Sequence, residues 1–174
     1  MAVYEFEGRK PEIPESSYVA ESAAVIGDVT LGQNCYIAPG ARIKGDYSTI
    51  VVGENSNVQE NCVIHARPRE RTEIENWVTI GHGAIIHGAT IHDYAVIGMG
   101  AIVSDDTEIG RWSVVGEGAV VTSGVEIEDE HVAVGVPAKT IKKISDSYKD
   151  TWKEIKEEYA SFSSRYRENL KRVD

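Results

Sequence analysis

Three of the five histidines fall within one short stretch of the chain, at His65, His82 and His87. Neutral imidazole is a good ligand for zinc and for several other divalent metals. Three such ligands with a fourth position left open are typical of a catalytic metal site rather than of a closed structural one. Because a lone histidine is more often a packed or surface residue, the metal hypothesis depends on how the fold positions these three side chains.

The element that must position them is a repeat of six residues. A period of six fits neither an α-helix nor a plain strand, whose periods are 3.6 and 2. It fits a short strand followed by a corner, with an aliphatic side chain pointing inward, and three such units would close one triangular coil. The aliphatic positions are Val25, Leu31, Ile37 and Ile43, then Val52, Val58 and Ile64, then Ile74, Ile80 and Ile86, and, after a slip of one residue, Ile91, Ile97, Val103, Ile109, Val115, Val121 and Ile127.

This pattern resembles the left-handed parallel β-helix of the hexapeptide-repeat proteins over roughly residues 13–136. The left-handedness is implied by the resemblance, because the period alone does not determine it. A helical pattern follows the repeat, and Pro137 suits the first turn of a helix. We expect a mainly β fold, with the β-helix over 1–136 and a long α-helix over 137–174 packed on its flank as part of the same structural unit. The expected packing stripe is Ile141, Ile144, Tyr148, Trp152, Ile155, Tyr159, Phe162, Tyr166 and Leu170.

The composition excludes several classes of partner. The chain has 174 residues, with 18 Lys and Arg against 28 Asp and Glu, a formal charge of −10 and a pI near 5.0. An acidic protein is poorly suited to nucleic acid or to an anionic membrane surface. The sequence has no apolar run of transmembrane length and no signal-peptide pattern, so we expect a cytoplasmic protein. Cys35 and Cys62 are too few for a disulfide scaffold, and we expect both to be buried thiols that do not pair.

The repeat register places the histidines relative to one another. Ile64 and Ile86 occupy the same face of successive coils, so His65 and His87 project outward about 4.8 Å apart, one strand spacing. That separation suits two imidazoles meeting at one metal. His82 belongs to the preceding face and would complete the site only from a neighbouring chain. The sequence therefore predicts a homotrimer in which the metal lies between subunits.

The motifs around these residues resemble those of the γ-class carbonic anhydrases, in particular their short-loop subgroup. The resemblance covers nearly the whole chain, ends in the helix containing Tyr159, and implies a lyase (carbonate dehydratase). Such an enzyme converts carbon dioxide reversibly to bicarbonate by a metal-bound hydroxide at trimer interfaces. The metal would be zinc, with iron or cobalt as alternatives. The matching segments are Lys44-Gly45-Asp46, Asn57-Val58-Gln59-Glu60-Asn61, His65-Ala66, Gly81-His82 and His87-Gly88.

The resemblance also implies roles for three further residues. Gln59 would hydrogen-bond the metal-bound water. Glu60, where the family usually has Asp, would support the site by holding Gln59 or by accepting the departing proton. Tyr159 loosely matches a tyrosine that the C-terminal helix places near the metal.

The chain departs from the family pattern at two places. Lys44 replaces the usual arginine before Gly-Asp, and lysine cannot form the bidentate contact, so we expect a weaker or rearranged interface contact. Tyr47 follows Asp46 where the prototype has an acidic residue, and the loop after His65 is short. Candidate replacements for the missing proton shuttle, although typical of a solvated surface loop, are Glu70, Glu73 and Glu75.

Two other functions remain open on the sequence. A hexapeptide-repeat protein could transfer an acyl group or hydrolyse a coenzyme A thioester, with one histidine as base and a groove for the pantetheine arm. It could instead be a non-catalytic trimeric scaffold whose metal is structural. Fold analogy alone does not choose among these functions. His92 and His131 belong to no constellation, and we expect them to be surface residues.

Overall fold

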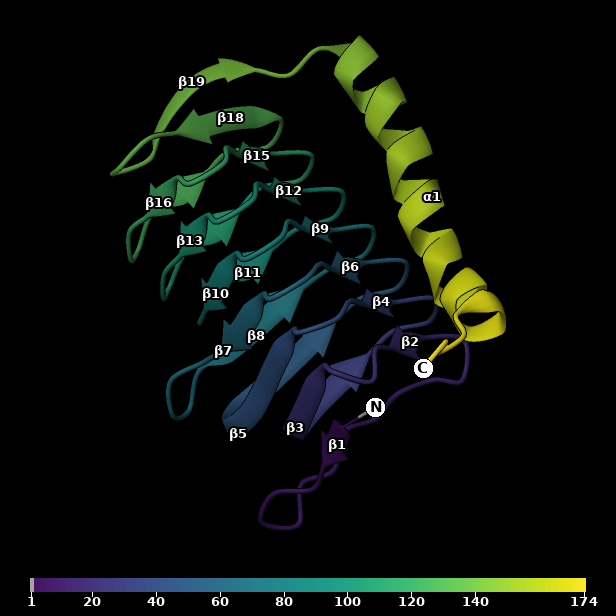
Figure 1. Cartoon of the computed structure of the whole chain (residues 1–174). Helices are drawn as coiled ribbons and strands as arrows, with labels where there is room; N and C mark the ends of the chain where they lie inside the picture. Colours follow the sequence, from purple (N-terminus) through teal and green to yellow (C-terminus); the bar gives the residue numbers. More distant parts are fainter. Residues whose placement is uncertain (1) are drawn as a thin grey trace.

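Short parallel strands, stacked coil upon coil, make up most of the computed structural model, which describes residues 2–174 (Figure 1). One sheet wraps around two faces of the coil. Its strands, in spatial order, are β16 (Val120–Val121), β13 (Ile102–Val103), β10 (Ile85–His87), β7 (Val63–His65), β5 (Arg42–Val52), β8 (Arg71–Ile74), β11 (Thr90–Ile91), β14 (Glu108–Ile109) and β17 (Glu126–Ile127), with β3 (Ala24–Leu31) beside β5 and β1 (Ala2–Tyr4) beside β3.

A second sheet forms the third face. Its strands, in spatial order, are β19 (Lys139–Lys143), β18 (His131–Val134), β15 (Val114–Val115), β12 (Val96–Ile97), β9 (Thr79–Ile80), β6 (Asn57–Val58), β4 (Tyr36–Ile37) and β2 (Tyr18–Val19). All its pairs are parallel except the first, in which β19 runs antiparallel to β18.

The register confirms the predicted β-helix. Ile64 pairs with Ile86 and Val58 with Ile80, each aliphatic residue lying beside its equivalent in the next coil. These side chains are fully buried and form one continuous core along the axis of the stack. Cys35 and Cys62 lie in this core as free thiols, as expected.

One column of corner residues combines the left-handed backbone conformation with large aromatic rings. Trp77, Tyr94 and Trp112 have φ values of 58°, 62° and 60°, a region that bulky residues rarely adopt. Their rings stack in sequence, with centroids 6.1 Å and then 4.6 Å apart. Stacking of this kind contributes favourable energy beyond area burial, and it offsets part of the backbone cost.

The prediction that the helix begins near Pro137 is wrong. The helix α1 spans Asp146–Asn169, and the preceding residues form β19. The backbone groups of β19 pair with the free edge of β18, which would otherwise be unsatisfied at the last coil. The helix starts only where Ser145 supplies a cap, its side chain accepting from the backbone N–H of Tyr148 at 3.2 Å.

The helix packs on the flank of the β-helix, as predicted. It runs along the face that carries β4, β6, β9 and β12 and returns to the end of the stack where both termini lie (Figure 1). Phe162 and Tyr166 pack on Tyr36, with ring centroids 5.5 Å and 5.0 Å from it. Within the described part of the chain, no helix is both long enough and apolar enough to cross a membrane.

A close backbone contact at one corner gives a test of the coil packing. Gly27 has φ +77°, and a Cβ added there would lie 2.5 Å from the carbonyl oxygen of Gly45 in the next coil. Gly100 has φ +67° with no heavy atom within 4 Å of the corresponding position. We expect Gly27→Ala to lower the free energy of unfolding by about 2 kcal/mol more than Gly100→Ala, since both share the backbone strain but only the first overlaps another coil. Urea denaturation of both variants measures the difference, and equal losses would contradict the packing described.

Candidate functional site

The structure brings His65 and His87 together at the ends of β7 and β10. The two residues pair in register, with ring centroids 5.2 Å apart. His65 Nδ1 and His87 Nε2 face each other at 3.2 Å. Strand pairing therefore places the two imidazoles side by side, with one nitrogen of each ring facing the other.

A carboxylate holds the remaining nitrogen of each ring. Asp46 Oδ1 lies 2.9 Å from His65 Nε2, and Asp105 bonds His87 Nδ1. A histidine that binds a metal nearly always has its other ring nitrogen hydrogen-bonded to a carboxylate, a carbonyl or water. This arrangement fixes the orientation of both rings and leaves only the two facing nitrogens for a ligand.

The spacing of these nitrogens suits a zinc-like ion. Two nitrogen ligands of a tetrahedral zinc, each 2.0–2.1 Å from the metal, lie about 3.3 Å apart, close to the 3.2 Å observed. Within residues 2–174 of one chain, no group of three or more His, Cys, Asp or Glu side chains is arranged to hold a metal ion. The pair therefore fits part of a metal site, and its assignment as metal ligands stays a prediction.

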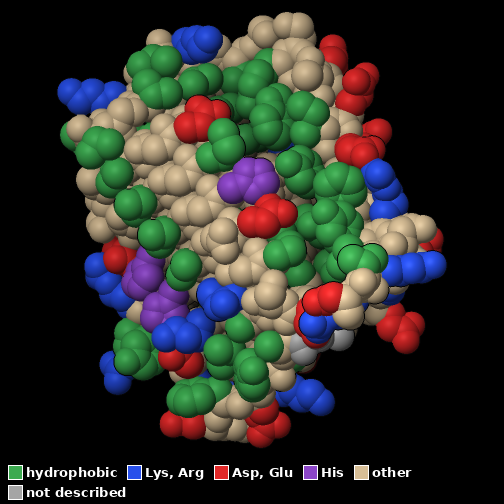
Figure 2. Space-filling model, in the orientation of Figure 1, with side chains coloured by type: hydrophobic (Ala, Val, Ile, Leu, Met, Phe, Trp, Pro, Cys, Tyr) green, Lys and Arg blue, Asp and Glu red, His purple; other side chains and the backbone are tan. Residues whose placement is uncertain are grey.

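His82 lies away from this pair, at the corner between β9 and β10. Figure 2 shows histidine side chains at two separate places on the visible face. The His82 side chain is half exposed, and its Nδ1 lies 2.5 Å from Glu60 Oε2. Glu60 thus contacts His82. It forms no hydrogen bond with the Gln59 amide, although holding Gln59 was one of its two expected roles. His82 Nε2 is left as the nitrogen able to bind a ligand.

Gln59 is buried beside His82. Its Oε1 accepts from the backbone N–H of His82 at 3.2 Å, and its Nε2 donates to Asn57 Oδ1 at 3.2 Å. Tyr159 reaches the same place from α1. Burial, and then the charge of Glu60, raise the pKa of the Tyr159 phenol against the opposing effect of a hydrogen bond with Gln59.

Lys44 makes its contact within its own chain. Its Nζ lies 3.2 Å from Asp46 Oδ2. Burial of Asp46 opposes ionisation, but the hydrogen bonds from His65 and Lys44, together with the Lys44 charge, outweigh it and lower the pKa of Asp46. Asp46 is therefore held as the carboxylate that His65 needs, and Lys44 supports it.

Asp105 is a site residue that the sequence reasoning missed. It is 7% exposed, and Arg67 Nη2 from the loop after β7 lies 2.5 Å from its second oxygen. Thr72, after the same loop, donates to the His65 carbonyl and accepts from the Gly88 amide, which ties the loop to both coils. The repeat gave only a partial clue: Ile86 pairs with Val103, so Ser104 is the equivalent of His87 in the next coil and Asp105 lies one residue further along.

Comparison with known proteins identifies the family. The family model of the GMPPB C-terminal domain matches residues 47–154. The carnitine operon protein CaiE of Proteus sp. is 34% identical over 171 residues, which cover 98% of this chain and 86% of CaiE. A carbonic anhydrase of Geobacillus kaustophilus is 34% identical over 165 residues, which cover 95% of this chain and 91% of that enzyme.

A solved structure agrees over the whole fold. The product of the BC4754 gene of Bacillus cereus, provisionally described as an acetyltransferase, superposes with a TM-score of 0.95 at 32% identity, covering 97% of this chain and 98% of that one. The chain belongs to the hexapeptide-repeat transferase and γ-carbonic anhydrase-like family. Its β-helix is accordingly the left-handed one of hexapeptide-repeat proteins. Family membership does not select the reaction, because one relative is named a carbonic anhydrase and another is described, provisionally, as an acetyltransferase.

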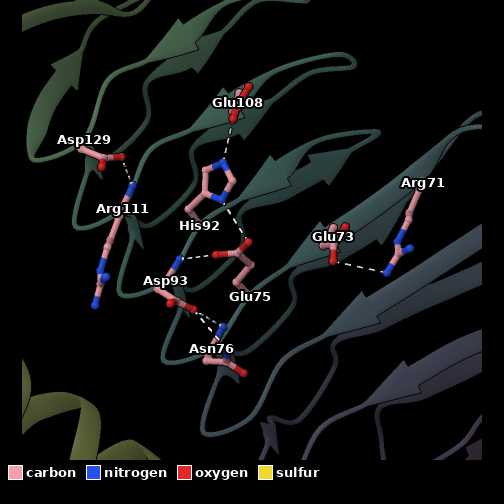
Figure 3. A network of polar contacts seen from close by, with 9 residues as sticks. All are labelled: Arg71, Glu73, Glu75, Asn76, His92, Asp93, Glu108, Arg111 and Asp129. Carbon is pink, nitrogen blue, oxygen red and sulfur yellow. Dashed lines mark hydrogen bonds and ion pairs between the residues drawn. The ribbon is translucent and has the colours of Figure 1, made fainter.

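The three glutamates considered as replacements for the proton shuttle have different environments in this hexapeptide-repeat protein. One oxygen of Glu70 is buried next to Gly88 and has no hydrogen-bond partner among the described residues. Glu73 pairs with Arg71 at 3.3 Å. Glu75 bonds His92 on the face that carries β8, β11 and β14, among the polar side chains drawn in Figure 3.

His92 lies between two carboxylates in this network. Its Nδ1 is 3.0 Å from Glu75 Oε1, and its Nε2 is 2.8 Å from Glu108 Oε1 (Figure 3). Burial disfavours the imidazolium, but the hydrogen bonds and charges of Glu108 and Glu75 outweigh it and raise the pKa of His92. The folded protein therefore binds this proton more tightly than the unfolded chain does.

This shift predicts a pH-dependent contribution to stability. The contribution is fully present below the unfolded pKa of about 6.5 and is lost as the pH rises through the higher folded pKa. We expect wild-type protein to exceed His92→Gln in free energy of unfolding at pH near 5, with the gap closing at pH near 9. Urea titrations at both pH values measure the gap, and His131→Gln serves as a control. A gap that is the same at both pH values would contradict the pairing.

Proposed function

We propose that this protein catalyses the reversible hydration of carbon dioxide to bicarbonate at metal sites between the subunits of a homotrimer. The proposal rests on a feature that His65, His82 and His87 have in common. In each of them a carboxylate engages one ring nitrogen, and the other nitrogen remains for a ligand. Two of these nitrogens already converge within one chain, and the third needs a second chain to join them.

The exposed face next to the pair supports assembly through a partner subunit. Val63, Ile85 and Ile102 stand in register on the outer side of β7, β10 and β13, and each remains more than a third exposed. Figure 2 shows a file of hydrophobic side chains leading to histidine side chains on the left of the visible face. His65 follows Val63 by two residues, and so lies on the same outer face. A second subunit that covers this row of apolar residues would bury their surface, and it could bring His82 of the partner subunit to the pair of histidines.

Zinc bound at these histidines, or iron or cobalt in its place, would supply the Lewis acidity that lets water ionise near neutral pH, as zinc does in carbonic anhydrases. Asp46, Glu60 and Asp105 would keep the imidazoles in the tautomer that presents a lone pair to the ion. They would also increase the basicity of these ligands, which tightens metal binding.

Gln59 and Tyr159 are the polar groups that could orient the reacting oxygen. The Gln59 Nε2 carries two N–H groups: one donates to Asn57, and the other is the donor of the hydrogen bond with Tyr159, which leaves the Tyr159 O–H to face the reacting oxygen. Because the Tyr159 pKa is raised from a value already near 10, the phenol stays protonated at neutral pH. We propose that it donates a hydrogen bond and does not act as a base.

Hydration of carbon dioxide by the zinc-loaded protein, followed by stopped flow, tests the function directly. We expect rapid hydration in wild-type protein and a loss of about 100-fold or more in His82→Ala, because a ligand is missing. His131→Ala is the matched control, since the ring of this histidine lies at the start of β18, with Nδ1 2.9 Å from the Asp129 carbonyl, and is not one of the three carboxylate-bound histidines of the site. Metal content is measured in every sample. Wild-type protein that holds metal but hydrates no carbon dioxide would refute the proposed reaction.

Mixed trimers test whether the site is shared between chains. His82→Ala and His65→Ala homotrimers should both be inactive, because every site lacks a ligand. Coexpression should restore about a quarter of the sites, since random assembly places an intact pair beside an intact His82 with that frequency. If all three ligands came from one chain, coexpression would restore nothing.

Acyl transfer or hydrolysis of a coenzyme A thioester is the second candidate, favoured by the likeness to the Bacillus cereus structure. It differs from hydration in what metal removal does: metal-free protein would still turn over a thioester if a histidine were the base. A third possibility, a non-catalytic trimeric scaffold, requires chelation to dissociate the trimer without any activity being present.

A further inference from the structure

The most deeply buried side chain of α1 is a lysine. Lys156 is 1% exposed, although the sequence pattern around it is that of a half-buried surface helix. None of the carboxylates in residues 2–174 forms an ion pair with it. Its Nζ instead lies 2.7 Å from the Trp77 carbonyl, 3.2 Å from the Ala95 carbonyl and 3.3 Å from Thr79 Oγ1.

This arrangement satisfies the ammonium at a considerable desolvation cost. Three acceptors match its three N–H groups. Burial nevertheless lowers the pKa of Lys156 to about 7. A methionine of similar length would fill the same space without that cost, so the lysine needs a reason beyond packing the helix.

Thr79 also takes part in a series of hydrogen bonds between buried side chains. Asn57 Nδ2 donates to Thr79 Oγ1 at 3.0 Å, and Gln59 Nε2 donates to Asn57 Oδ1 at 3.2 Å. All three residues are at most 4% exposed, so water does not compete for these groups. The series ends at the backbone N–H of His82, which donates to Gln59 Oε1 at 3.2 Å.

Each hydrogen bond in this series has a defined direction from donor to acceptor. The backbone N–H of His82 can only donate, so the Gln59 oxygen must face it and the Gln59 nitrogen must face Asn57. The Asn57 oxygen then faces Gln59, and its nitrogen faces Thr79. Thr79 Oγ1 consequently accepts from Asn57, and its second lone pair is left for a donor.

We propose that Lys156 is a positioning residue, which supplies that donor and so holds the Gln59 side chain through Thr79 and Asn57 in the orientation that faces His82. The helix thereby contributes to the site from the flank of the β-helix, since it runs beside β6, β9 and β12 (Figure 1). This inference rests on the proposed function, because the orientation of Gln59 affects activity only if the site acts as proposed.

The test reads the orientation of the amides directly, in metal-free protein. Lys156→Met removes the donor, and Thr79→Val removes the hydroxyl while leaving both carbonyl contacts of Lys156 in place. We expect the side-chain amide NMR signals of Gln59 and Asn57 to shift and to exchange about 10-fold faster with solvent in both variants. Thr79→Ser should keep the wild-type signals, because it retains the hydroxyl.

Lys149→Met separates positioning from simple attachment of the helix. Lys149 also anchors α1 to the β-helix, at 2.6 Å from Glu130, but it lies outside the series of hydrogen bonds that leads to Gln59. We expect this variant to lose stability without moving the amide signals. Unchanged signals in Lys156→Met and Thr79→Val, or equal changes in Lys149→Met, would overturn the proposal.

The rate of carbon dioxide hydration is then compared between wild-type protein and the same variants. If the zinc-loaded protein hydrates carbon dioxide, Lys156→Met and Thr79→Val should each lower kcat by about 10-fold at unchanged metal content. If wild-type protein shows no hydration while the amide signals still move, the proposed function fails and the positioning role stands.

Discussion

Parallel pairing of equivalent residues in successive coils governs the whole surface of this protein. Because each coil repeats the one before at a spacing of about 4.8 Å, any side chain type repeated at one position becomes a column on the outside. His65 beside His87, and Val63 beside Ile85, are two such columns on one face. The loop after His65 is accommodated at a corner, so the coils on either side keep their register.

The sequence predicted what depends on that period. It predicted the β-helix, the buried core and the adjacency of His65 and His87, since all three follow from counting in sixes. It could not predict Asp105, whose contact with His87 depends on a corner side chain and on Arg67 reaching across from a loop. The false helix start had a physical origin too: Ile141 has helical spacing, but the open edge of β18 pairs with this segment instead.

Lys156 shows a different limit of sequence reasoning. Its neighbours Trp152 and Ile155 predict a stripe that packs on the β-helix, and a lysine within such a stripe reads as a surface residue with a long stem. Its burial is explained by the Trp77 and Ala95 carbonyls, which lie 79 and 61 residues away along the chain. A stripe pattern records which residues are apolar and contains no information about acceptors on the opposing surface.

The antiparallel strand β19 has a consequence for the solution behaviour of the molecule. A stack of identical coils has no intrinsic length, and an uncovered last coil would present a ready template for another molecule to extend end to end. β19 covers that edge and carries Lys139, Lys142 and Lys143, all exposed. Because the hydrogen-bonding groups of β18 are already paired and lysines line the covering strand, this end of the β-helix is a poor template for a further coil.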